Sequence, residues 1–74
     1  MMCPLTDLQV GQQAEVIEIE TRREGRLMRL STYGLIPGSQ VTLRQRDYAY
    51  VVMVGETEVA LDGEVAREIM VEAG

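Results

Sequence analysis

The sequence contains no histidine, no tryptophan and no phenylalanine, its seven basic residues are all arginines, and its one cysteine is Cys3. Structural zinc sites are built mostly from cysteine and histidine, so a chain with one thiol and no imidazole does not encode one. A single cysteine also excludes an internal disulfide. Without histidine the chain lacks the commonest general base, and without lysine it lacks the phosphate loop G-x-x-x-x-G-K-[ST]. We therefore expect a protein that is not an enzyme and that carries no cofactor.

The remaining candidate metal ligands are carboxylates. Oxygen ligands for a hard cation are available from Glu18, Glu20, Glu56, Glu58 and Asp62. None of these belongs to a loop with acids at alternate positions, and alternating glutamates on a strand are typical of its solvated face. We expect no metal site, and binding of a metal ion by these carboxylates is the alternative.

Long apolar runs are also absent. No segment of the 74 residues approaches the roughly 20 consecutive apolar residues that a membrane-spanning helix needs. The N-terminal stretch MMCPLTDL has neither the basic region nor the apolar region of a secretory signal. With 46% hydrophobic residues, the chain has enough apolar material for one small core. We expect one domain over residues 1–74, located in the cytoplasm and not inserted in a membrane.

Five short segments have the composition of β-strands. Alternating or clustered apolar residues mark them within the ranges 11–20, 39–46, 50–54, 58–61 and 69–71. Turn-forming stretches separate them, and the sequence DGEVARE at 62–68 is long enough for one helical turn. Closure into a barrel removes the exposed edges that a small flat sheet would leave. The expected fold is mainly β: a small SH3-like β-barrel of about five strands, with one short helix between the first and second strands and a helical turn before the last.

The helix between the first two strands has a distinct end. In the sequence RLMRLSTYGLIPGSQV, at residues 26–41, Gly34 follows Tyr33 at the position of a left-handed cap residue. If the helix ends at Tyr33, then Leu30 and Leu35 are the pair whose apolar contact accompanies a Schellman motif. We expect Leu30 and Gly34 to be structural residues.

A type II turn is expected directly after this helix. Ile36 precedes a proline and is therefore extended, Pro37 sets the backbone of the first corner, and Gly38 supplies the positive φ of the second. The chain then reverses into the strand that contains Val41. Gly38 is accordingly a third structural residue.

Helical angles divide the helix into two faces. One face is apolar or small and consists of Leu27, Met28, Leu30 and Ser31. The other face carries Arg26, Arg29 and Tyr33. On the residues alone, a crossover helix with no binding role is the simpler interpretation.

Charge is distributed unevenly along the chain. Between Thr21 and Arg46 there are six arginines and one glutamate, a net charge of +5, whereas the remainder has one arginine and eleven acids, a net charge of −10. A small domain with this polarity is expected to present a basic side that holds the helix, and an opposite acidic side. Arginines that only keep the surface polar are the alternative.

The chain resembles a known family from Leu5 to Glu72. Three stretches in order carry the resemblance: LTDLQVGQQAEVIEI, then RLMRLSTYGLIPGSQV, then VALDGEVAREIMVE. The most specific positions are Leu30, Gly34, Leu35, Pro37, Gly38 and Val41, followed by Leu61, Glu64, Ala66, Ile69, Val71 and Glu72. In this order they are similar to ferrous iron transport protein A (FeoA), a family of small cytoplasmic SH3-like domains.

This resemblance implies an accessory role in ferrous iron uptake and no catalysis. The implied partner is the ferrous iron transporter FeoB, whose cytoplasmic portion carries a GTP-binding domain. We expect the partner to be bound by the basic helix face and the bend after it, through Arg26, Arg29, Tyr33, Leu35, Ile36 and Pro37.

Two other functions stay open. A FeoA-like domain also resembles the interaction module of metal-dependent transcriptional regulators, although this sequence shows no helix-turn-helix. Some SH3-like barrels bind nucleic acid, and the six clustered arginines provide cationic groups for it. An isoelectric point of about 4.5 works against that function, and we expect no nucleic-acid partner.

Overall fold

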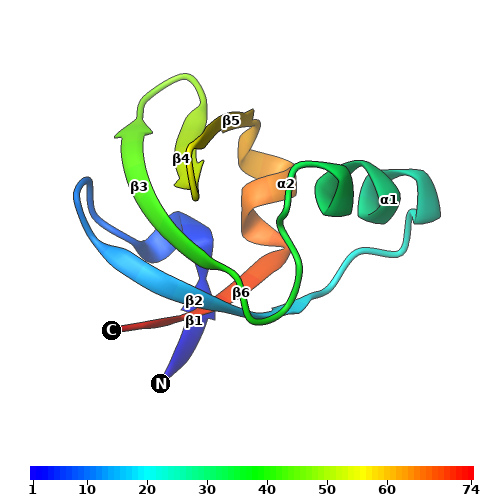
Figure 1. Cartoon of the computed structure of the whole chain (residues 1–74), viewed down its shortest axis with the longest axis horizontal. Coiled ribbons are helices and arrows are strands. Elements are labelled where there is room, and N and C mark those ends of the chain that lie inside the picture. The colour runs from blue at the N-terminus through cyan, green and yellow to red at the C-terminus, as the bar shows by residue number, and fades with distance from the viewer.

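The chain forms six strands and two short helices (Figure 1). The computed structural model describes all 74 residues. The strands are β1 (Met2–Pro4), β2 (Gln13–Ile19), β3 (Gln40–Arg46), β4 (Tyr50–Val54), β5 (Thr57–Leu61) and β6 (Ile69–Ala73). The helices are α1 (Glu24–Thr32) and α2 (Gly63–Arg67), and a single 3-10 turn, η1, covers Leu5–Asp7. The mainly β character, the helix between the first two expected strands and the helical turn before the last are confirmed.

All six strands form one antiparallel sheet in the order β1-β6-β2-β3-β4-β5. β1 pairs only with β6, and β5 pairs only with β4, so the sheet is open and has a free edge at each end. The expected closed barrel of about five strands is therefore wrong in two respects. The sheet does not close, and it includes a sixth strand, β1. Three residues that end in a proline carry too little alternation to mark a strand in the sequence.

The core lies inside the curl of this sheet. It contains 14 buried side chains, all of them apolar, and no polar side chain is buried. Register shifts between Val16 and Glu18 in β2, and between Leu43 and Gln45 in β3, are β-bulges that bend the strands and increase their twist. Figure 1 shows the curved strands and α2, which leads from β5 to β6. Neither helix has the length and apolar character needed to span a bilayer.

The end of α1 has the geometry of a Schellman motif. The Leu35 N–H donates to the Leu30 carbonyl at 2.9 Å, and the Gly34 N–H donates to the Ser31 carbonyl at 3.0 Å. Gly34 has a φ of 87°, in the left-handed region that favours glycine. The Leu30 and Leu35 side chains are 2% and 0% exposed. The motif therefore anchors the last turn of α1 to the core.

A type II turn follows the helix. The Ser39 N–H donates to the Ile36 carbonyl at 3.0 Å, and Gly38 has a φ of 98° at the second corner. The Ser39 hydroxyl donates to the Gly34 carbonyl and so ties the turn to the helix end. The chain then enters β3, and Ile36 and Pro37 are exposed at the bend.

Candidate functional site

A groove separates α1 from the end of β5 and from α2. Its volume is about 470 Å³, within the range of about 300–1,000 Å³ that binding pockets span. One wall is formed by α1 and the residues that cap its two ends, with Arg23, Gly25, Arg26, Arg29, Leu30 and Tyr33. The other wall is formed by Ala60, Leu61, Asp62 and Val65. Three arginines and a tyrosine from one helix converge here on an apolar base, which makes the groove the candidate functional site.

The groove face of α1 differs from the face that the sequence predicts. Arg26, Leu30 and Tyr33 follow the spacing i, i+4, i+7 and all line the groove. Leu30 is therefore at the centre of this face, and its assignment to the opposite face is wrong. The side chains of Leu27 and Met28 are 44% and 70% exposed, so the expected apolar face of the helix faces solvent.

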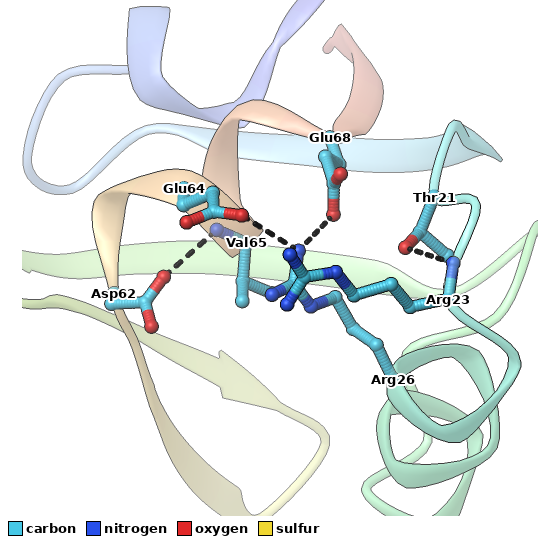
Figure 2. Close-up of polar contacts among 7 residues, drawn as sticks. All are labelled: Thr21, Arg23, Arg26, Asp62, Glu64, Val65 and Glu68. Atoms are coloured by element: carbon cyan, nitrogen blue, oxygen red, sulfur yellow. Dashed lines mark hydrogen bonds and ion pairs between the residues drawn. The ribbon is translucent and has the colours of Figure 1, made fainter.

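Arg26 closes one end of the groove by an ion pair with α2. Its Nη1 donates to Glu68 Oε1 at 2.7 Å and to Glu64 Oε1 at 3.5 Å (Figure 2). The Arg26 side chain is only 16% exposed, because its stem runs along the helix–helix gap. Arg26 was expected to contact the partner from the helix face that it shares with Arg29 and Tyr33, but its side chain is mostly buried and its charge is compensated within the domain.

The ion pair shifts the ionisation of both partners. The hydrogen bond from Arg26 is the largest cause that lowers the pKa of Glu68, and desolvation of the carboxylate opposes it. The same hydrogen bond raises the pKa of Arg26. Since each charged form stabilises the other, the pair holds α1 against α2 at neutral pH.

The Arg26–Glu68 pair is expected to make stability depend on acid pH. Because folding lowers the pKa of Glu68 below its ordinary 4.5, the stabilisation is fully present above that pH and is lost as the pH falls through the lowered folded value. Replacement Glu68→Gln removes this contribution. Denaturant unfolding of both proteins from pH 7 to pH 3 measures it, and the difference in unfolding free energy should shrink on acidification. A difference that does not change with pH would contradict the assignment.

The other residues expected to bind the partner lie in three different environments: the groove, the exposed turn and the core. Arg29 and Tyr33 are exposed and line the groove, with Tyr33 41% exposed. Ile36, which is 48% exposed, and Pro37 lie on the turn, outside the groove lining. Leu35 is 0% exposed. Leu35 was expected in the contact surface, and this is wrong because the hydrogen bond of the Schellman motif to Leu30 places the Leu35 side chain in the core.

Sequence reasoning missed Arg23 and the whole wall opposite α1. Arg23 precedes Arg26 by three residues, so helical spacing alone would have placed the two arginines on one face. Figure 2 shows both side chains extending from α1 toward α2. Asp62 is the N-cap residue of α2, and its carboxylate accepts the Val65 N–H at 2.9 Å. An aspartate just before a helical turn was the available signal for that cap.

Two of the groove arginines, Arg23 and Arg29, form no salt bridge, and Arg23 contributes only a minor charge effect to the lowered pKa of Glu68. Within the domain, ion pairs involve only Arg26 with Glu64 and Glu68, and the N-terminus with Glu72. Arg23 and Arg29 have none. Arg26 is already compensated by Glu64 and Glu68, so the uncompensated groove arginines are Arg23 and Arg29, and the one carboxylate among the lining residues is that of Asp62. The groove can therefore bind a negatively charged group by charge-assisted hydrogen bonds.

Comparison with known protein families matches the FeoA domain over residues 3–73. The chain belongs to the FeoA family. A crystal structure of an iron uptake regulatory protein (FeoA) is similar, with 23% identity and a TM-score of 0.89, over 100% of this chain and 99% of that one. The fold is SH3-like, and the family is associated with ferrous iron transport. Comparison with curated proteins found no match.

Two further structures show where else the FeoA fold occurs. Iron(II) transport protein A from Clostridium thermocellum has 26% identity and a TM-score of 0.83, over 95% of this chain and 44% of that one. IdeR from T. acidophilum has 23% identity and a TM-score of 0.93, and the match covers 99% of this chain but 34% of the IdeR chain. The same fold thus makes up 99% of the chain of the iron uptake regulatory protein, but 44% and 34% of the chains of these two structures.

Proposed function

We propose that this FeoA domain is a cytoplasmic accessory of ferrous iron uptake that binds the cytoplasmic portion of a FeoB-type transporter. Membership of the FeoA family supports the association with iron transport. One observation carries the binding role: the groove holds Arg23 and Arg29 without internal ion pairs beside the exposed ring of Tyr33. Tyrosine and arginine are the residues that most often anchor protein interfaces.

The bend after α1 extends the proposed contact surface. Ile36 is an exposed apolar residue on a turn fixed by hydrogen bonds to Ser39. A rigid apolar residue on the turn that follows an arginine-bearing helix is suited to an interface in which an apolar centre is rimmed by charge. Ile36 and Pro37 therefore remain in the proposed surface, together with Arg29 and Tyr33, whereas Leu35 does not.

A second candidate function follows from the similarity to IdeR. The chain aligns over 99% of its length with 34% of IdeR and with 42% of a manganese-dependent transcriptional repressor, so the domain has the fold of one part of a larger repressor. In that function the groove would hold a segment of the regulator instead of a transporter. Pull-down from cells of the source organism separates the two, because one yields the transporter and the other a DNA-binding chain.

Charge reversal in the groove tests the proposed function. Arg29→Glu is expected to lower affinity for the purified cytoplasmic portion of a FeoB-type transporter about tenfold at low salt, since an attractive charge becomes repulsive. Added salt should reduce the wild-type affinity and so make the difference in affinity between the wild type and Arg29→Glu smaller. Arg44→Glu on β3 is the matched control, because it has the same charge change outside the groove. Isothermal titration calorimetry gives both values, and equal affinities for the two variants would reject the groove as the interface.

A further inference from the structure

The outer edge of β5 is a row of free backbone groups. β5 pairs only with β4, through a hairpin in which Val54 lies opposite Thr57 across a two-residue turn. The pair that flanks such a turn is hydrogen-bonded, and hydrogen-bonded pairs alternate with non-bonded ones along the hairpin. The N–H and C=O groups of Glu58 and Ala60 therefore point away from β4. None of the hydrogen bonds outside the regular elements involves either residue.

The groove lies beside this edge. Ala60 and Leu61 line it from β5, and α1 forms the facing wall. α1 starts near α2, where Arg26 contacts Glu68, and ends near the hairpin, where a Cβ on Gly34 would lie 3.4 Å from Val54 Cγ1. The helix thus runs from the α2 end of β5 toward the end of β4 at the hairpin, and of β5 only Ala60 and Leu61 line the groove. The free edge of β5 and the helix α1 therefore flank this part of the groove, which we call the slot.

We propose that this slot binds an extended acidic segment of the partner, which adds to the sheet as a strand beside β5. Main-chain hydrogen bonds to Glu58 and Ala60 provide affinity, as in other complexes formed by strand addition. The arginines of α1 select the segment by charge: Arg23 and Arg29 are the unpaired cations of the facing wall. The inference rests on the proposed function, because it defines which part of the partner enters the groove.

The opposite edge of the sheet does not offer the same site. β1 has three residues, and Pro4 has no N–H to donate. No residue of β1 lines the groove. β5 has five residues without proline, of which only Glu58 carries a charge that would oppose pairing. Of the two free edges, β5 is therefore the one that an added strand can extend.

Hydrogen exchange on the full chain tests the proposal without any substitution. The probe is the cytoplasmic portion of a FeoB-type transporter, added to protein labelled with ¹⁵N. We expect the amide protons of Glu58 and Ala60 to become protected in the complex, while those of Arg44 and Arg46, outside the groove, keep their exchange rates. Protection of these two amides without any partner, together with a dimer in solution, would overturn the proposal in favour of self-pairing through β5.

A proline substitution provides the second measurement. Ala60→Pro removes the outward N–H and leaves the β4 hydrogen bonds in place, so affinity for the same probe should fall at least about fivefold. Ala60→Ser keeps the N–H at similar size and should retain wild-type affinity. If the probe binds but neither protection nor the proline effect is seen, strand addition is wrong and the proposed function stands. If wild-type protein does not bind the probe, both are wrong. If circular dichroism shows that Ala60→Pro is unfolded, the exchange measurement alone decides.

Discussion

Replacement of Leu35 by alanine is expected to lower the unfolding free energy by about 2–5 kcal/mol, the usual cost of truncating a buried leucine. Leu35 is 0% exposed and belongs to the 14-residue core. A domain of this size has a total stability of roughly 4–11 kcal/mol, so the loss is a large share of it. Denaturant unfolding followed by circular dichroism measures the change.

The neighbouring residue is the matched control. Ile36→Ala removes a side chain of the same size that is 48% exposed, and its effect on stability should stay below about 1 kcal/mol. Under the proposed function, Ile36→Ala should instead reduce affinity for the transporter portion. Similar losses of stability in the two variants would mean that the Schellman motif does not direct Leu35 into the core.

The strands and the end of α1 could be predicted because their signals are local. Alternation such as Ala14 and Val16 against Glu15 marks a half-buried strand within a few residues. The cap at Gly34 depends on a single glycine with positive φ, followed by Leu35 at a fixed offset. Local steric and hydrogen-bond rules determine both features, so they do not need information from the rest of the chain.

Features that depend on distant partners were missed. β1 is a strand because it pairs with β6, with Cys3 opposite Val71. The sequence of three residues is too short to predict this pairing. The outcome for Arg26 depends on Glu64 and Glu68, which follow it by about 40 positions. The groove itself arises only when α1 is placed against β5. Charge counting along the sequence identified the basic helix, but not which arginine is already neutralised.

The arginines of the basic segment between Thr21 and Arg46 have two different roles. Arg26 serves the fold, because it joins α1 to α2. Arg29 and Arg23 remain available, because they line the groove without an ion pair. One helix therefore combines a structural arginine with two that can bind a ligand, and only variants of the latter should separate binding from stability.

Replacement Gly34→Val is expected to lower the unfolding free energy by about 1–3 kcal/mol, since a β-branched side chain resists positive φ. Gly34 has a φ of 87°, and an added Cβ would lie 3.4 Å from Val54 Cγ1, so the backbone strain comes with a tight contact. Gly25→Val at the start of α1 is the control, because Gly25 has no positive φ and nothing lies within 4 Å of an added Cβ. Valine has a helix propensity only a few tenths of a kcal/mol better than that of glycine, so this control should change stability by less than about 0.5 kcal/mol and should not destabilise the fold. Thermal and denaturant unfolding measure both variants, and equal stabilities would show that the left-handed cap does not hold α1 in place.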